Sequence, residues 1–265
     1  MMTLNNVKIF FRNDDPDVFY YGDKRQELYQ LTELFIKKNI PLVHAVVPNS
    51  ITDQTISYLL KVDRQSDLLE FIQHGWSHGK YATGEFDATR SYFEQHKDIK
   101  SGRIKMQTIF GDKFFSAFTA PYGIYSNITY NVLRELNFKV VSSSVKYDIK
   151  NRIFNTIGHI FGIKFFKDKR VSYHDRTICH TNLQEISISI NIMRKDKADK
   201  IRDIREIINK IRHFSSFTNN IGILVHHINL KSDHFLILEQ LLEDLMEANY
   251  SFSKISSIYN SNLYL

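Results

Sequence analysis

The sequence is short of cysteine: Cys179 is the only one among 265 residues, so an internal disulfide is excluded. A lone cysteine fits a reducing compartment. No apolar run approaches the roughly 20 residues that cross a bilayer. Residues 1–6 also lack the basic and apolar regions of a signal peptide. We therefore expect a cytoplasmic protein with no membrane span.

Internal repeats, low-complexity linkers and a visible domain boundary are also missing. The length suits one large α/β domain or two small ones. The hydrophobic fraction of 43% is enough for a sizeable core. We therefore expect one domain over residues 1–265, with its oligomeric state left open.

A strong excess of one charge is absent, although the formal net charge is +6 and the pI about 9.1. A basic balance can indicate nucleic acid or an anionic surface as the partner. Here acidic residues are mixed among the basic ones, and the densest region, residues 194–212, alternates both signs at helical spacing. That pattern is typical of a solvated helix face, so we expect no nucleic-acid partner.

Hydrophobic patterning predicts strands that alternate with helices. Apolar, β-branched and aromatic runs indicate strands, and apolar residues at helical spacing indicate helices. The predicted strands are 7–11, 42–47, 68–74, 114–118, 138–141, 184–190, 221–225 and 252–258. The predicted helices are 22–39, 51–62, 85–107, 127–136, 197–214 and 233–249, while 144–182 looks irregular. This order predicts an α/β fold with a parallel sheet, either open or closed into a barrel.

Polar residues follow several of these predicted strands at the point where each strand ends. The carboxyl ends of parallel strands meet at one rim, where α/β folds collect their active sites. We therefore expect these sequence-distant residues to lie close together. They are Asp14 and Asp15, His74, Pro121 and Tyr122, and His226 and His227.

Asp15, His74 and His78 form a candidate metal site of two histidines and one carboxylate. Such ligands suit zinc above all, and also iron, cobalt, nickel or manganese. Three protein ligands leave positions open for water and substrate, as in a catalytic site. Taken alone, the two histidines of residues 73–79 could equally be surface residues on a polar turn, and the aspartates could belong to a turn.

The other rim residues suggest acid–base chemistry. Neighbouring side chains diverge, so Asp14 is expected to take a proton from water while Asp15 binds the metal. His226 or His227 is the candidate to protonate a leaving amine, although one of the two could be a core residue. The backbone N–H after Pro121 is a candidate oxyanion donor.

Four segments carry a family resemblance: Arg12-Asn13-Asp14-Asp15, His74-Gly75-Trp76-Ser77-His78, Thr119-Ala120-Pro121-Tyr122 and Leu224-Val225-His226. In order and spacing the chain resembles the polysaccharide deacetylases of carbohydrate esterase family 4, with the NodB-like fold, over residues 7 to about 250. The resemblance implies a distorted (β/α)7-type barrel. It also implies that Asp14 is the base, that Asp15, His74 and His78 hold the metal, that His226 is the acid, and that the Tyr122 amide helps to form the oxyanion hole.

The chain departs from the family pattern at several positions. The usual Thr-Phe-Asp-Asp-Gly has Arg12, Asn13 and Pro16 in place of three of its five residues. Thr119 stands where the family has the arginine that orients the base, and Arg12 is the candidate to replace it from the other side. The late-middle motif with an Asp and a Trp is not visible. These departures indicate a divergent branch, in which His227 could matter as much as His226.

Some further residues admit two interpretations. Trp76 is expected either to stack on a sugar or to pack beside the metal loop, and Glu85 and Arg90 could reach the rim. His44 is expected in the core, and Cys179 to be inert. No spacing argues for a second site at the histidines of the irregular segment, which are His159, His174 and His180.

Together these features predict a metal-dependent hydrolase that removes an acyl group, N-acetyl as the first candidate, from a sugar or glycan. The substrate could be a polymer, a nucleotide sugar or a lipid-linked sugar. The alternative is a degenerate barrel that binds a glycan without hydrolysis, having lost the orienting arginine. A third possibility is binding to nucleic acid or an anionic surface through the basic charge.

Overall fold

The computed structural model describes residues 7–17, 22–145, 149–163, 176–178, 182–194 and 200–262. Cys179, His174 and His180 lie outside these ranges, as does the side chain of His159. The strands are β1 (Lys8–Asp14), β2 (Leu42–Val46), β3 (Leu69–His74), β4 (Phe114–Thr119), β5 (Val140–Val141), β6 (Arg176–Thr177), β7 (Gln184–Glu185), β8 (Ile188–Asn191), β9 (Asn220–Val225) and β10 (Ser251–Phe252).

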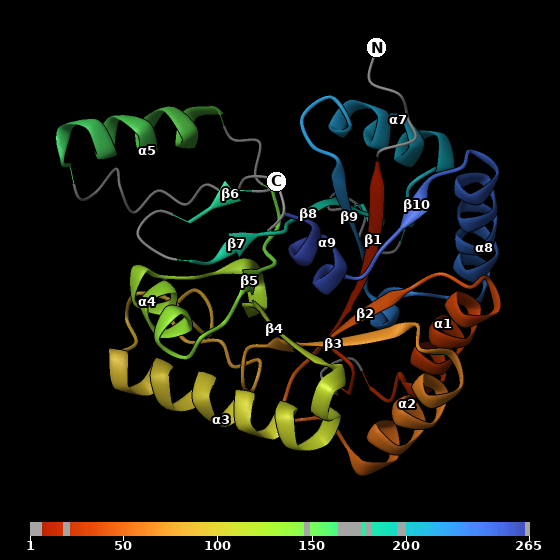
Figure 1. Cartoon of the computed structure of the whole chain (residues 1–265), viewed down its shortest axis with the longest axis horizontal. Coiled ribbons are helices and arrows are strands. Elements are labelled where there is room, and N and C mark those ends of the chain that lie inside the picture. Colours follow the sequence, from red (N-terminus) through yellow and green to blue (C-terminus); the bar gives the residue numbers. More distant parts are fainter. Residues whose placement is uncertain are drawn as a thin grey trace.

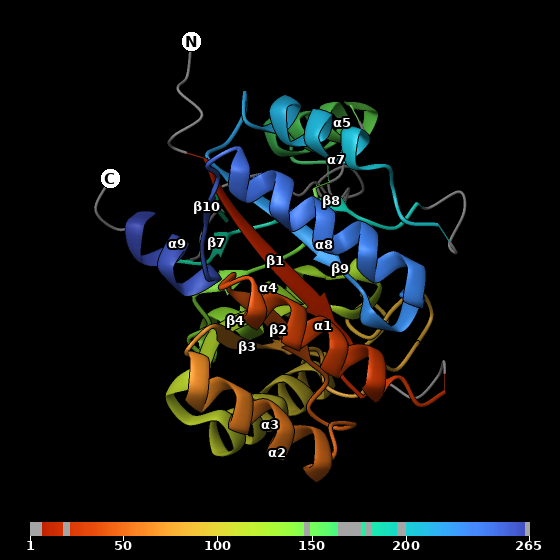
Figure 2. The same cartoon turned by 90° about the vertical axis from the view of Figure 1, so that its right-hand side faces the viewer.

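One sheet contains all of these strands, in the order β6-β7-β5-β4-β3-β2-β1-β9-β8, with β10 beside β1. Only the β6–β7 pair is antiparallel among the described strands. Figure 2 shows β1 and β9 side by side with their arrowheads at the same end. The carboxyl ends of the parallel strands therefore meet at one rim, as predicted.

The segment from β7 to β8 brings the two ends of the sheet together. On one side β7 pairs with β5, and the Ile188 N–H donates to the Ser143 carbonyl at 2.7 Å. On the other side β8 pairs with β9, with a register shift between Ile188 and Ile190. The predicted strand 184–190 is therefore split, and its two halves join different neighbours. The result is the predicted distorted barrel.

Helices surround the strands in Figure 1, except for α5, which stands apart at the upper left. The α-helices are α1 (Arg25–Lys37), α2 (Asp53–Ser66), α3 (Tyr92–Phe110), α4 (Asn127–Glu135), α5 (Ile149–Phe161), α7 (Ile204–Phe214), α8 (Ser232–Glu247) and α9 (Ile255–Asn262). Short 3-10 turns are η3 (Gly111–Lys113), η4 (Pro121–Gly123) and η5 (His227–Asn229). Among the described residues, no helix is both long and apolar enough to cross a bilayer.

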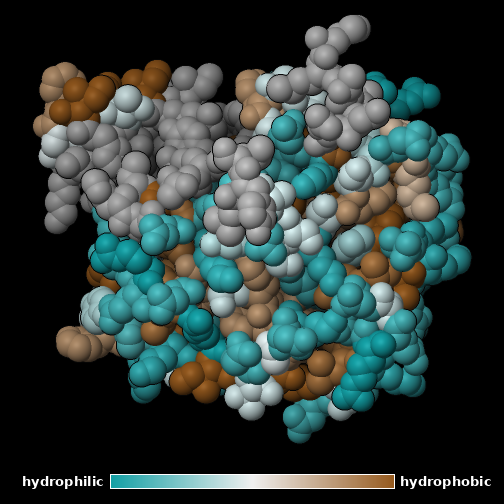
Figure 3. Space-filling model, viewed as in Figure 1, coloured by the Kyte–Doolittle hydropathy of each residue, from teal (hydrophilic) through white to brown (hydrophobic). Residues whose placement is uncertain are grey.

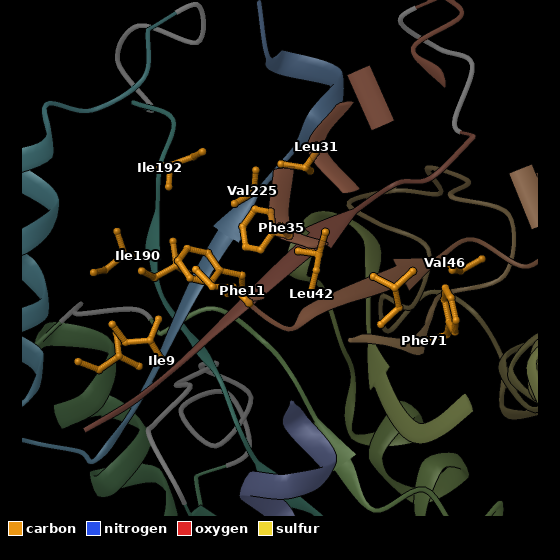
Figure 4. Packing of buried hydrophobic residues seen from close by; sticks show 14 of the residues in the cluster. Ile9, Phe11, Leu31, Phe35, Leu42, Val46, Phe71, Ile190, Ile192 and Val225 are labelled. Atoms are coloured by element: carbon orange, nitrogen blue, oxygen red, sulfur yellow. The ribbon is translucent and has the colours of Figure 1, made fainter. Parts of the chain in front are cut away.

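Side chains alternate between two buried layers, because successive residues of a strand point to opposite faces. Ile9 and Phe11 face the helices, and Figure 4 shows Phe11 beside Phe35 of α1. Phe10 faces the barrel interior and belongs to a separate cluster with residues from the other barrel strands. This alternation directs Arg12 and Asp14 inward and Asn13 outward. The inner cluster is Phe10, Val43, Ala45, Ile72, Ala117, Val140, Ile186, Ile188, Leu224, Ile255 and Ile258.

Several exposed apolar side chains lie on α5. Ile160 and Phe161 are 69% and 71% exposed, and Ile153 is 53% exposed. Figure 3 shows brown atoms at the corresponding upper left corner, beside atoms drawn in grey. This helix lies in a segment that looked irregular in sequence.

Several sequence predictions about secondary structure are wrong. The helix predicted at 197–214 begins at Ile204 in the described part of this segment. The strand predicted at 252–258 is mostly the helix α9, because Ile255 and Ile258 pack under the barrel at helical spacing. The buried Glu70 carboxylate also accepts hydrogen bonds from the first amides of α9. The helix predicted from residue 85 begins instead at Tyr92, where Ser91 and Glu94 form a capping box.

Candidate metal and catalytic site

Asp15, His74 and His78 lie together at the barrel rim. The Oδ1 atom of Asp15 is 3.0 Å from His74 Nε2 and 3.2 Å from His78 Nε2. One ligand atom from each residue lies within 4.8 Å of the others, so the three could hold a metal ion. One carboxylate oxygen and two imidazole nitrogens fit a divalent cation such as zinc. The structure thus brings together the predicted ligand set.

The electrostatics of this group suit a cation. Burial alone would raise the pKa of Asp15, but His74 and His78 outweigh it and hold that pKa well below its ordinary value. Burial would lower the pKa of His74, yet the Asp15 carboxylate raises it overall. The carboxylate is therefore ionised, as a metal ligand must be.

Backbone strain at the end of β1 lets two adjacent acids reach one site. Asp14 is the last residue of the strand, whereas Asp15 has a φ of 67°. A left-handed backbone is uncommon outside glycine and ends the alternation of the strand. Asp17, with a φ of 60°, then accepts hydrogen bonds from the Thr52 amide and hydroxyl, which anchors the turn to α2.

A backbone carbonyl orients His74. Its Nδ1 lies 3.2 Å from the carbonyl oxygen of Thr119, in β4. A carbonyl can only accept, so Nδ1 carries a proton and Nε2, which faces Asp15, is the nitrogen that a metal ion would use. This outer contact fixes the tautomer that binds metals. Thr119, which replaces the family arginine, thus contributes through its backbone.

Glu85 holds the loop that carries His78. It is fully buried and accepts hydrogen bonds from the Trp76 amide at 3.2 Å and from the Ser77 amide at 2.7 Å. Gly75 has a φ of +60°, and a Cβ there would lie 2.2 Å from Glu85 Oε2. Only glycine fits this turn. Glu85 therefore reaches the site as a support for its loop.

Arg12 and Asp14 form a buried bidentate ion pair. Arg12 Nε is 2.7 Å from Asp14 Oδ1, and Nη2 is 2.8 Å from Oδ2. The third arm, Nη1, donates to the hydroxyl and carbonyl of Ser142, after β5. Burial would raise the pKa of Asp14, but the charges of Arg12, His74 and His226 hold it below its ordinary value. Arg12 thus holds the Asp14 carboxylate in place from within β1.

The two adjacent histidines after β9 have different surroundings. The side chain of His226 is 21% exposed, and its Nε2 lies 4.0 Å from a carboxylate oxygen of both Asp14 and Asp15. His227 is buried, and both its amide and its Nδ1 lie 3.0 Å from Asn13 Oδ1. Burial lowers the pKa of His227 to about 3. Only His226 therefore stands open beside the aspartates.

Tyr122 contacts the loop after β3 from the neighbouring strand β4, which it follows. It has a φ of 59° in the turn that Pro121 opens, and its hydroxyl donates to the His78 carbonyl at 3.1 Å. Its ring centroid is 4.8 Å from that of His78, and the side chain is 47% exposed. Trp76 is half-buried, and its carbonyl accepts from the Asn49 amide. Of these two aromatic residues, Tyr122 thus contacts the candidate metal group directly.

Sequence reasoning missed the supporting residues, which are Asn13, Ser142, Glu85 as a loop support, Asp17 and the Thr119 carbonyl. Asn13 did carry a signal, because it is a polar residue on the outward face of a strand whose neighbours on that face are apolar. The other contacts depend on backbone atoms or on distant segments. His44 is a buried core residue, as predicted, and burial lowers its pKa to about 3.

Part of the chain matches a known family in sequence. The family model described as polysaccharide deacetylase matches residues 21–141, which include His74, His78, Pro121 and Tyr122. No curated protein matches the chain.

Solved structures resemble the chain over nearly its whole length. A protein from Mycobacterium smegmatis that is assigned to the polysaccharide deacetylases covers 100% of this chain with 92% of its own, at 12% identity and a TM-score of 0.67. A Streptococcus mutans CE4 esterase covers 94% with 87% of its own, at 12% identity and a TM-score of 0.58. A family 4 acetyl xylan esterase from Clostridium thermocellum, in complex with a cobalt ion, covers 96% with 91% of its own, at 14% identity and a TM-score of 0.55.

The family match and the structural matches both cover residues of the candidate site. The family match lies in the part of the chain that supplies the two histidine ligands, and the structural match extends to the strands that carry Asp15 and His226. Over residues 21–141 the sequence matches the polysaccharide deacetylase family model, and the whole chain shares the barrel fold of these solved structures.

Proposed function

We propose that this protein is a metal-dependent hydrolase that removes an acyl group, N-acetyl first among the candidates, from a sugar or glycan. The observation that supports this most is the meeting of the Asp15, His74 and His78 group with the buried Arg12–Asp14 pair at one rim. The candidate metal ligand Asp15 directly follows the candidate base Asp14 in the sequence. The single catalytic domain and the cytoplasmic location stay predictions.

Asp15, His74 and His78 would hold the cation. Zinc is the first candidate, with iron, cobalt, nickel and manganese as alternatives. The cobalt ion in the Clostridium thermocellum esterase supports a divalent cation on this fold. Such an ion would supply Lewis acidity, which makes water a stronger nucleophile and polarises an acyl carbonyl.

The chain's own groups would move the protons. Asp14, kept ionised by Arg12, accepts the proton of the attacking water. The Tyr122 amide donates to the oxygen that becomes negatively charged. His226 then gives a proton to the leaving amine, so that the amide C–N bond breaks and acetate and a free amine result. Trp76, Pro121 and Tyr122 shape the surface on which the sugar lies.

The alternative, a glycan-binding barrel without catalysis, was motivated by the missing arginine. The buried Arg12–Asp14 pair supplies an orienting cation from β1 and so favours hydrolysis. The basic surface offers no comparable observation for a nucleic-acid partner.

The first test combines metal content with turnover. His74→Ala should lose both the bound metal, measured by elemental analysis, and acetate release from N-acetylated and O-acetylated glycans. Asp14→Asn should keep the metal and lose turnover by about 100-fold or more. His96→Ala, a change at a histidine on α3 that faces Glu135, serves as the control. Full metal retention in His74→Ala would contradict the ligand assignment.

A further inference from the structure

Asn13 lies at the junction of three elements behind the catalytic rim. It is fully buried in β1, where its register partners are His44 in β2 and Val225 in β9. Its side chain points away from Asp14 and contacts two histidines. Asn13 Oδ1 is 3.0 Å from His227 Nδ1, and Asn13 Nδ2 is 3.2 Å from His44 Nδ1.

Backbone atoms at both ends set the direction of every hydrogen bond in this network. At one end the His227 amide donates, so the Asn13 atom facing it must be the oxygen. The same oxygen then accepts from Nδ1–H of the His227 ring, and the Asn13 amide nitrogen faces His44. His227 therefore carries its proton on Nδ1.

The other end gives the same assignment independently. The Thr32 hydroxyl donates to the Leu28 carbonyl at 2.8 Å, which leaves its oxygen to accept from His44 Nε2 at 3.5 Å. His44 then carries its proton on Nε2, and its Nδ1 accepts from Asn13. The hydrogen bonds at both ends of the network require the same orientation of the Asn13 amide.

This network makes the two adjacent histidines chemically different. His227 has no proton on Nε2 to give, and burial keeps it neutral. Two hydrogen bonds to one oxygen also fasten the start of η5 to β1. The residue just before that anchored turn is His226, whose Nε2 faces both aspartates.

We infer that Asn13 is a positioning residue: it locks His227 as the neutral Nδ1–H tautomer and thereby fixes the turn that presents His226 to Asp14 and Asp15. The catalytic consequence rests on the proposed function, because it takes His226 as the acid. The tautomers and the anchored turn do not depend on that function.

Histidine NMR tests the tautomers directly in the full chain, with and without Zn²⁺. Long-range ¹H–¹⁵N spectra of ¹⁵N-histidine-labelled protein, assigned with His44→Gln and His227→Gln, should show His227 protonated at Nδ1 and His44 at Nε2. Both should stay neutral from about pH 5 to about pH 8. A proton on Nε2 of His227, or titration of His227 in that range, would overturn the inference.

Kinetics test whether Asn13 acts through His226. Asn13→Leu keeps the shape and removes the hydrogen bonds, so kcat should fall by about 10- to 100-fold with metal content unchanged. In a His226→Ala background, the Asn13→Leu change should lower kcat only slightly further. An equal loss in both backgrounds would overturn the link to His226.

A second variant covers the case in which Asn13→Leu does not fold. Asn13→Asp keeps an oxygen for His227 but cannot donate to His44, so the His44 signal should change while His227 stays protonated at Nδ1. The reverse pattern would overturn the inference. Wild-type protein without turnover but with the expected tautomers would instead defeat the proposed function alone.

Discussion

Arg12, Asn13, Asp14 and Asp15 follow one another at the end of β1 and serve four different purposes. Arg12 and Asp14 point into the barrel as an ion pair, and Asn13 points outward to two histidines. Asp15 joins the metal group because its φ of 67° turns the chain after the strand ends. The alternation of a strand and one strained residue thus direct neighbouring side chains to a buried ion pair, a histidine network and the candidate metal group.

The Arg12–Asp14 pair should couple strongly in stability. Arg12→Gln leaves a buried carboxylate without its counter-charge, which typically costs about 3–5 kcal/mol in unfolding free energy. The double variant Arg12→Gln/Asp14→Asn should lose less than the sum of the single changes, because no buried charge is left unpaired. Urea unfolding measures all three. The control Arg64→Gln changes an exposed arginine of α2 and should have almost no effect. Strict additivity of the two single changes would contradict the coupling.

At the scale of elements, the candidate site is built from the last residues of strands and from the loops that follow them. The loop after β3 is held by Glu85 beneath it and by Tyr122 above it. Neither contact follows from periodicity, since both residues belong to other segments. The motif at residues 74–78 was visible in sequence, whereas the supports became visible only when the segments met.

Gly75→Ala should disturb the candidate metal loop for two reasons, the positive φ of residue 75 and the steric overlap of the new Cβ with its neighbours. The new Cβ would lie 2.2 Å from Glu85 Oε2 and 2.7 Å from Pro121 Cδ, so the loop must move. We expect metal affinity, measured by chelator competition, to fall at least about 10-fold with the fold retained. Gly111→Ala is the matched control, because Gly111 also has positive φ but has nothing within 4 Å of the added atom. Equal affinity in both variants would show that the close packing at Gly75 is unimportant.

Hydrophobic patterning predicts the bounds of some strands and helices better than those of others. β2, β4 and β9 lie within a residue of their predicted bounds, because runs of buried apolar residues define them. The late elements were less well predicted. Ile186, Ile188 and Ile190 alternate in sequence, yet the register shift divides them between β7 and β8. The segment predicted as the strand 252–258 forms the helix α9 instead, because Ile255 and Ile258 are buried against the base of the barrel.

At the scale of the molecule, closing the barrel buries polar groups between its layers. His44 and His227 are both fully or almost fully buried between β1 and the helices, and burial lowers the pKa of each to about 3. Their neutral forms are part of the packed structure. Folding is therefore linked to proton uptake by the unfolded chain.

That linkage predicts acid sensitivity. An unfolded histidine has a pKa of about 6.5. Between about pH 6.5 and about pH 3 the unfolded chain binds a proton at each site that the folded chain does not, so stability falls as the pH falls. Each histidine should contribute a slope of about 1.4 kcal/mol per pH unit. Urea unfolding of His44→Gln should show a shallower slope than wild type in this window. Parallel curves for the two proteins would contradict the buried, neutral His44.

Local sequence by itself determined the alternation of strands and helices and the polar residues at the rim, because these depend on short-range periodicity. The candidate ligand group of Asp15, His74 and His78 followed from residue chemistry together with the order of the four family-like segments. Only the tertiary structure decided that Arg12 orients Asp14, that Asn13 separates His226 from His227, and that Glu85 supports the metal loop. These contacts join segments far apart in the chain or depend on a single backbone angle. They form only when the barrel closes and brings the segments within hydrogen-bond distance.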